Sequence, residues 1–268
     1  MRGKYTIGYL TTAPMEPGEA LRLAQKLGYC GIGIRLAPLV PGGHFSPLCE
    51  NVALLRETKS SIKDTGVNIL DVEGVRLDEG FRRGSFDRQL EVAAELGAKA
   101  ISVVGDDVEE LRLVESFADL CDSATPYDLE VALEFMPYTS VRNSADALRI
   151  LREAQRSNGR MVFDFLHASR SHMTPADLSA IPQELLCFAQ LCDAPAEIPT
   201  TREALVHTAR YERLLPGTGG IDVRGLARVL PADLPLCIEI PNVKQLVQLG
   251  AEEWARRALA ATQKALAD

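Results

Sequence analysis

Four apolar runs in the second half of the chain each carry one oxygen-bearing side chain at the carboxyl end. These side chains are Glu134, Asp164, Gln190 and Glu239. A buried carboxylate costs several kcal/mol unless a cation or hydrogen bonds compensate its charge. If the runs are neighbouring parallel strands, their carboxyl ends meet at one edge, where three carboxylates repel one another without a divalent cation between them. The pattern therefore predicts a metal site with these four ligands.

The predicted ligand atoms are all oxygens, and this restricts the choice of metal. Oxygen ligation suits Mn²⁺, Mg²⁺ or Co²⁺ better than Zn²⁺, which prefers histidine and cysteine. We expect Mn²⁺, with Mg²⁺ and Co²⁺ as alternatives. Each residue taken alone could instead bond to loop backbone at the edge of the sheet, but four matching positions favour a shared ion.

Two further polar residues come after the predicted ligands at the same spacing. His167 stands three residues after Asp164, and a loop beyond the strand would let it reach over the metal to a substrate oxygen. The alternative for His167 is a capping or solvent-exposed side chain. Asp193 stands three residues after Gln190, and we expect it to contact the substrate side of the site or to orient a loop behind the ligands.

Arginines stand in the loop after the seventh predicted strand and at the end of the second. Arg210 and Arg213 stand beside the glycine-rich turn 216–220, and guanidinium groups bind phosphate or carboxylate groups through paired hydrogen bonds. Surface salt bridges are an equally weighted alternative for these two. Arg35 and Glu73 end the second and third predicted strands, where we expect them to form a salt bridge at the rim rather than to bind metal.

These side chains converge only if the strands that carry them are neighbours, and the order of elements indicates that they are. Strands alternate with helices, and strands that are apolar throughout are typical of parallel sheets covered by helices. The predicted strands are 5–10, 30–35, 67–73, 98–104, 129–135, 160–165, 185–191 and 236–240. The predicted helices are 16–27, 51–65, 86–96, 108–124, 143–157, 175–180, 202–208, 223–230 and 252–267.

Eight strand–helix repeats without a linker or low-complexity segment predict one (β/α)8 barrel domain of the α/β class over residues 1–268. Active sites of such barrels form at the carboxyl ends of the strands, which is where the four predicted ligands stand. The alternative is a doubly wound open sheet, which is disfavoured because no glycine-rich phosphate turn comes after the first strand.

Composition excludes several classes of protein. Apolar residues make up 46% of the chain, enough for a sizeable core, and the net charge of −8 argues against nucleic acid as a partner. The six cysteines contain no CxxC pair, so we expect reduced core thiols and a cytoplasmic protein. We find no membrane-length apolar stretch and no signal-peptide pattern after residues 1–4.

The motifs together resemble the xylose isomerase-like TIM barrel superfamily of sugar phosphate isomerases and epimerases, which also includes inosose and 3-dehydroshikimate dehydratases. The resemblance is strongest over residues 129–242. The segments that carry it are Asp164-Phe165-Leu166-His167, Gln190-Leu191-Cys192-Asp193-Ala194-Pro195, Arg213-Leu214-Leu215-Pro216-Gly217 and Ile238-Glu239-Ile240.

The resemblance implies a metal-dependent isomerase or epimerase that acts on a sugar or sugar phosphate. Such enzymes remove a proton next to a carbonyl and pass through an enediolate, which the metal stabilises. Carried over by position, Glu134 and Glu239 are the base and the acid, His167 contacts substrate, and Arg210 or Arg213 binds an anionic group. A homodimer would be unsurprising for this superfamily.

The chain also departs from the isomerase pattern, and this keeps two alternatives open. Ketose epimerases usually have histidine as the third ligand, where this chain has Gln190, and segment 190–195 resembles the dehydroshikimate dehydratases. Against a dehydratase, residues 71–76 lack the Gln-Pro-Phe-Arg run. The chain also departs from the family as a whole, because Thr218 stands where the glycine turn usually has an acidic residue. The alternatives are a metal-dependent dehydratase acting on a dehydroshikimate or a cyclic polyol ketone and, from another class, a non-catalytic sugar-binding barrel.

Overall fold

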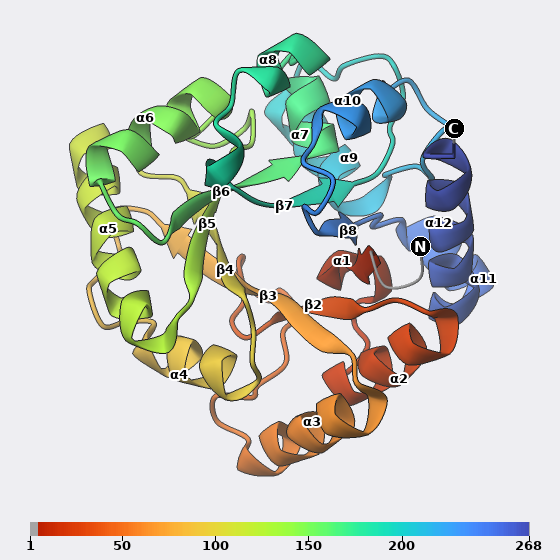
Figure 1. The fold of residues 1–268 in the computed structure, drawn as a ribbon, viewed down its shortest axis with the longest axis horizontal. Helices are drawn as coiled ribbons and strands as arrows, with labels where there is room; N and C mark the ends of the chain where they lie inside the picture. Colours follow the sequence, from red (N-terminus) through yellow and green to blue (C-terminus); the bar gives the residue numbers. More distant parts are fainter. Residues whose placement is uncertain (1–4, 268) are drawn as a thin grey trace.

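Within residues 5–267, which the computed structural model describes, eight parallel strands close into a barrel (Figure 1). Residues 1–4, where we expected no signal peptide, and residue 268 lie outside this range. Consecutive strands pair with each other, and β1 pairs with β8. The strands are β1 (Tyr5–Ile7), β2 (Gly31–Arg35), β3 (Asn68–Leu77), β4 (Ala100–Gly105), β5 (Glu130–Glu134), β6 (Gly159–Asp164), β7 (Leu186–Leu191) and β8 (Leu236–Ile238). This confirms the predicted barrel and excludes the open sheet.

Helices surround the barrel and bury their apolar faces against it (Figure 1). Glycines with positive φ end two of them, Gly28 at 85° and Gly66 at 67°, because glycine enters the left-handed region without strain. The predicted helices correspond to α2 (Pro17–Leu27), α3 (Val52–Thr65), α4 (Asp87–Glu95), α5 (Glu110–Ala124), α6 (Ser144–Ala154), α8 (Pro175–Ser179), α9 (Arg202–Tyr211), α10 (Val223–Val229) and α12 (Ala251–Ala265). Short 3₁₀ turns cover Thr125–Tyr127 and Gln183–Leu185.

Three helices were not predicted. The first strand stops at Ile7 rather than at residue 10, and α1 (Tyr9–Thr12) comes after it. His167 lies in α7 (Phe165–Arg170) instead of a loop, because the Asp164 side chain accepts a hydrogen bond from the His167 backbone N–H and caps the helix. The third is α11 (Val243–Leu249), which Asn242 caps in the same way.

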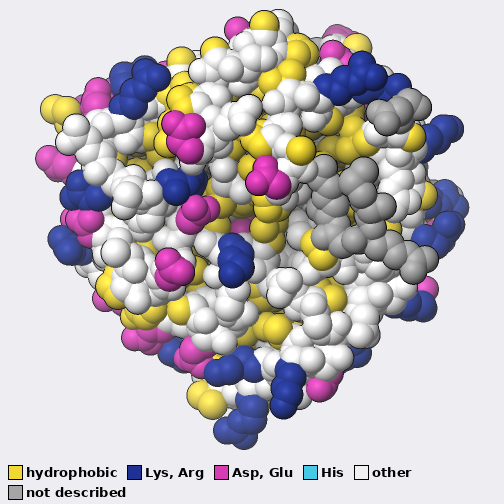
Figure 2. Space-filling view, viewed as in Figure 1, with side chains coloured by type: hydrophobic (Ala, Val, Ile, Leu, Met, Phe, Trp, Pro, Cys, Tyr) yellow, Lys and Arg dark blue, Asp and Glu magenta, His cyan; other side chains and the backbone are white. Residues whose placement is uncertain are grey.

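Figure 2 shows acidic and basic side chains interspersed over one face, with apolar side chains between them, rather than a continuous basic surface. Among residues 5–267, no helix is both long enough and apolar enough to cross a membrane.

A layer of small and apolar side chains fills the inside of the barrel. Its members are Leu70, Ala100, Ala132, Val162, Phe188 and Cys237, one from each strand from β3 to β8. Side chains alternate between the two faces of a strand, so the residue two positions later points inward again. On β5 to β7 and just beyond β8 that residue is Glu134, Asp164, Gln190 or Glu239. The barrel therefore stacks the four predicted ligands directly above its apolar filling.

A buried acid on β3 makes the stability of the folded protein depend on pH. Asp71 is 1% exposed and accepts a hydrogen bond of 2.6 Å from the Ser102 hydroxyl. Burial, together with the nearby Glu73 carboxylate, raises the pKa of Asp71 to about 8. Between about pH 4 and about pH 8 the folded protein therefore keeps a proton that the unfolded chain has released.

We expect stability to fall as pH rises through this window, with a contribution from Asp71 of up to about 1.4 kcal/mol per pH unit. The Asp71→Asn substitution removes the titrating group, so the free energy of unfolding should depend less on pH and should exceed the wild-type value at pH 8. Denaturant unfolding at pH 5, 6.5 and 8 gives, for each protein, the slope of the free energy of unfolding against pH. Equal slopes for the two proteins would contradict this account.

Candidate active site

A cavity lies at the carboxyl ends of the strands. Its volume is about 230 Å³, counted as the space that the centre of a water molecule can occupy. Six of the predicted site residues line it: Glu134, His167, Gln190, Arg210, Arg213 and Glu239. Asp164 is completely buried beneath this lining, and Asp193 lies outside it. Apolar side chains, among them Leu39, Val40 and Met136, form much of the remaining wall.

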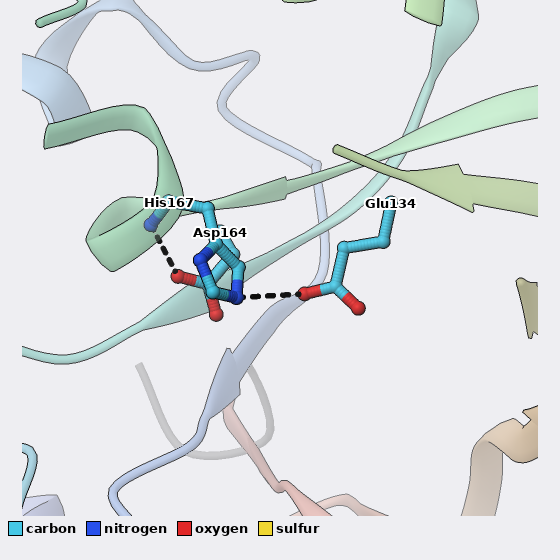
Figure 3. Close-up of side chains that lie close together, drawn as sticks. All are labelled: Glu134, Asp164 and His167. Atoms are coloured by element: carbon cyan, nitrogen blue, oxygen red, sulfur yellow. Dashed lines mark hydrogen bonds and ion pairs between the residues drawn. The ribbon is translucent and has the colours of Figure 1, made fainter. Parts of the chain in front are cut away.

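Three of the site residues form a compact cluster. One ligand atom each of Glu134, Asp164 and His167 lies within 4.8 Å of the others. Figure 3 shows the Glu134 carboxylate pointing toward the His167 imidazole, and its Oε1 lies 3.6 Å from His167 Nε2. Asp164 Oδ1 accepts the 3.0 Å hydrogen bond from the His167 backbone N–H. Because α7 begins immediately after Asp164, strand and helix together hold the acid and the imidazole side by side.

Burial determines the charge states of this cluster. It lowers the pKa of His167 to about 4, despite the nearby Asp164, so the imidazole is neutral at neutral pH. Burial and the Asp164 charge raise the pKa of Glu134 well above its ordinary value. Burial opposes ionisation of Asp164 too, but the Arg213 guanidinium outweighs it and lowers the pKa of Asp164. The site thus contains one stable carboxylate and one carboxyl group that readily holds a proton.

Glu239, the third acidic residue among the predicted ligands, stands apart from the cluster. Its Oε2 lies 3.7 Å from Arg213 Nη2, and burial together with the Glu73 charge raises its pKa well above the ordinary value. Gly8 makes room for it, since a Cβ at that position would lie 2.7 Å from the Cβ of Glu239. A side chain at residue 8 would displace Glu239, so glycine is required at this close approach.

The donor set fits a divalent cation. Within the described residues, Gln190 Oε1 and Glu239 Oε1 are buried without a hydrogen-bond partner, and both are acceptors that a cation would satisfy. His167 Nδ1 is buried and unpartnered as well. Together with Glu134 and Asp164 these atoms offer oxygen ligands and one neutral imidazole around the same cavity.

The pair Arg35 and Glu73 and the pair Arg210 and Arg213 have different surroundings. Arg35 and Glu73 form the expected salt bridge, with 2.5 Å between Nη2 and Oε2, which confirms that prediction. Arg210 lines the cavity, and within residues 5–267 it forms no salt bridge. Arg213 is 2% exposed, and Asp164 and Glu239 already occupy its guanidinium. Of the two arginines near the glycine turn, Arg210 therefore has the group that is free for a substrate anion.

Asp193 anchors a loop and does not reach the cavity. Its two carboxylate oxygens accept hydrogen bonds of 2.8–3.0 Å from four backbone N–H groups, those of Ala194, Gly217, Gly219 and Ile221. Of the two roles weighed for Asp193, the geometry matches the loop-orienting one. The anchored turn comes directly after Arg213, so Asp193 helps to position that guanidinium.

Sequence reasoning missed Tyr9 and His44. The Tyr9 hydroxyl lies 2.6 Å from His44 Nδ1, and the Arg35 guanidinium carbon lies 4.5 Å from the centre of the Tyr9 ring. Both residues line the cavity, opposite in the barrel order to β5 and β6. For strands five to eight we expected the functional side chain at the strand's carboxyl end. The same rule applied to the first strand would have identified Tyr9.

Comparison with known proteins gives consistent relatives. The profile of the xylose isomerase-like TIM barrel family matches residues 21–265. A 3-dehydroshikimate dehydratase from Pseudomonas aeruginosa is 28% identical over 203 residues, which is 70% of this chain and 31% of that protein. The chain thus spans about a third of the length of that dehydratase.

Two further relatives match over most of their length. An inosose isomerase from Bacillus velezensis is 26% identical over 219 residues, covering 76% of this chain and 75% of that protein. The crystal structure of the IOLI protein with a bound zinc atom has a TM-score of 0.78 and 21% identity, and each chain is covered to 98%. This structural likeness shows the shared fold.

We expect Asp193→Asn to destabilise the protein by about 3 kcal/mol, because the amide NH₂ group would face backbone N–H groups that now donate to an oxygen. Thermal or denaturant unfolding measures the loss. Asp78→Asn is the matched control, since Asp78 accepts one such bond, from Gly80, at a partly exposed turn. Equal stability of the two variants would show that the anchor contributes nothing.

Proposed function

The chain belongs to the xylose isomerase-like TIM barrel family, and we propose that it is a divalent-metal-dependent isomerase or epimerase of a small, sugar-like hydroxy carbonyl compound. The observation that supports this most is the pair Glu134 and Glu239. Both line one cavity, and they come from the ends of β5 and β8, which are not neighbours in the barrel. Two carboxyl groups on different sides of a bound substrate are what removal and return of a proton require.

The four residues predicted as ligands would hold the ion: Glu134, Asp164, Gln190 and Glu239. When bound, a divalent ion acts as a Lewis acid that stabilises the negative charge developing on a carbonyl oxygen during proton removal. Mn²⁺ is our first choice for the ion, with Mg²⁺ and Co²⁺ next. The bound zinc of the related IOLI structure belongs to that protein, and the imidazole of His167 is a nitrogen donor of the kind that favours zinc.

The protein's own residues would move the proton. Glu134 takes it from the carbon next to the carbonyl, and the neutral His167 imidazole beside it hydrogen-bonds the substrate oxygen or exchanges the proton with Glu134. Glu239 returns a proton from the opposite side of the substrate, which inverts the configuration of that carbon. Alternatively it delivers the proton to the neighbouring carbon, which gives the isomer. Arg210 binds a phosphate or carboxylate group of the substrate at the cavity wall.

A second candidate function is dehydration. It is favoured by Gln190, which stands where epimerases usually have histidine, and by the dehydratase relative at 28% identity. Both reactions share the first proton removal and differ in the second step. In dehydration a β-hydroxyl leaves as water, and His167 or Glu134 supplies its proton.

Metal content tests the ligand set. After saturation with Mn²⁺ and desalting, we expect about one ion per wild-type chain and almost none in Asp164→Ala, because the most stable carboxylate is lost. Elemental analysis gives the ratio, circular dichroism checks that the variant is folded, and Asp64→Ala on the exposed side of α3 is the control. Equal manganese in wild type and Asp164→Ala would exclude Asp164 as a ligand, and no manganese in any of the three proteins would favour a non-catalytic sugar-binding barrel.

Solvent isotope incorporation tests the reaction. In D₂O with Mn²⁺, an inosose, a ketohexose or 3-dehydroshikimate should gain deuterium next to the carbonyl, and Glu134→Gln should slow this about 10²–10⁴-fold. Glu239→Gln should retain exchange but lose formation of the epimer or isomer. NMR and mass spectrometry monitor both, and an ultraviolet-absorbing product that has lost one water would instead establish the dehydratase. Unchanged exchange in Glu134→Gln would rule out Glu134 as the base.

A further inference from the structure

Arg213 lies among the proposed ligands rather than at the cavity mouth. Its Nη1 is 2.6 Å from Asp164 Oδ2 and 3.3 Å from the Glu239 carbonyl oxygen, and its Nη2 is 3.7 Å from Glu239 Oε2. The side chains of Arg213, Asp164 and Glu239 are exposed by 3%, 0% and 4%. A buried guanidinium therefore already neutralises part of the negative charge that the proposed metal would neutralise.

Arg213 is also fixed in place independently of its carboxylate partners. Its Nε donates to the Ala209 carbonyl at 2.9 Å, its backbone N–H donates to the Pro241 carbonyl, and its own carbonyl accepts from the Asn242 side chain. The turn after it is anchored by Asp193. Main-chain contacts on both sides thus hold the guanidinium between the loop after β7 and the end of β8.

Both oxygens of Asp164 are already engaged. Oδ1 accepts the His167 backbone N–H at 3.0 Å, and Oδ2 accepts Arg213 Nη1. A metal ion that uses Asp164 must therefore share an oxygen with one of these donors or displace it. The N–H of His167 belongs to the first turn of α7, and main-chain contacts hold the guanidinium, so an ion that binds Asp164 Oδ2 has to compete with the positive charge of Arg213 for that oxygen.

We propose that Arg213 is a built-in counter-cation, which holds Asp164 and Glu239 in the folded protein before a divalent ion binds and which competes with that ion for Asp164. The inference rests on the proposed function, because it takes Asp164 and Glu239 as metal ligands. It makes Arg213 a positioning residue that weakens metal binding while it stabilises the metal-free protein. An arginine with only a structural role would stabilise the metal-free protein but would not weaken metal binding.

The test compares chelator-treated wild-type protein with Arg213→Met, Arg213→Lys and Arg210→Met. Arg210 is the matched control, since it lies three residues earlier, lines the same cavity and forms no salt bridge within the described part of the chain. Thermal unfolding without metal shows whether Arg213 stabilises the buried carboxylates. Calorimetric titration with MnCl₂ shows whether Arg213 competes with the ion.

Without metal, we expect Arg213→Met to melt about 10 °C below wild type, because two buried carboxylates lose their cation, and Arg210→Met to melt with wild type. Arg213→Lys should recover most of the loss, since it keeps the charge. For Mn²⁺ we expect the dissociation constant of Arg213→Met to fall at least about tenfold, because the competing positive charge is gone.

Two results would overturn the proposal: an Arg213→Met protein that melts with wild type, or one that binds Mn²⁺ no more tightly than wild type does. If Arg213→Met folds only when Mn²⁺ is present, the ion has replaced the guanidinium, as proposed. If it fails to fold in either condition, the ion cannot replace it and the proposal is wrong. A wild-type protein that binds no Mn²⁺ would refute the proposed function separately, while the melting comparison would still test the holding role.

Discussion

The organisation of this protein depends on one electrostatic constraint, the accumulation of negative charge above the apolar filling of a closed barrel. Glu134, Asp164 and Glu239 point inward from strands that the barrel brings together, and each is largely removed from water. Such an arrangement is stable only if positive charge or bound protons compensate it. Arg213 provides the compensation within the chain, raised pKa values provide part of the rest, and a divalent ion fits the remainder.

The same constraint separates the roles of residues that have the same chemistry. Asp164 is bound by Arg213 and by the first turn of α7, so it remains ionised and serves as a fixed point. Glu134 has the neutral His167 as its neighbour and readily takes up a proton. The surroundings of these two neighbouring carboxyl groups thus move their pKa values in opposite directions.

Much of this was predictable from the sequence. The barrel was indicated by the alternation of apolar strands and helices, and the placement of Glu134, Asp164, Gln190 and Glu239 by the rule that active sites of such barrels lie at the strand ends. Arg35 and Glu73 were predicted to form salt bridges because each ends a predicted strand, and the structure pairs them with each other. The strands and the positions of these residues at their ends could be predicted because the two-residue period and the order of apolar runs can be read from the local sequence.

The features that sequence reasoning missed depend on partners distant in the chain. The burial of Arg213 results from contacts with β6 and with the segment after β8, which no local pattern encodes. The helix at residue 165 depends on one side chain, Asp164, that acts as strand end and helix cap at once. Likewise, Asp193 resembled a site residue by its spacing, but its four backbone donors come chiefly from a turn more than 20 residues later.

Anomalous diffraction would show whether the carboxylates at this barrel mouth form a divalent-metal site, as we propose. Crystals of the protein grown with MnCl₂ and measured on both sides of the manganese absorption edge would locate the ion. We expect one strong peak within bonding distance of Asp164 and of at least two of the residues Glu134, Gln190 and Glu239. No peak in the cavity at saturating Mn²⁺, or peaks only at surface carboxylates, would contradict the proposal.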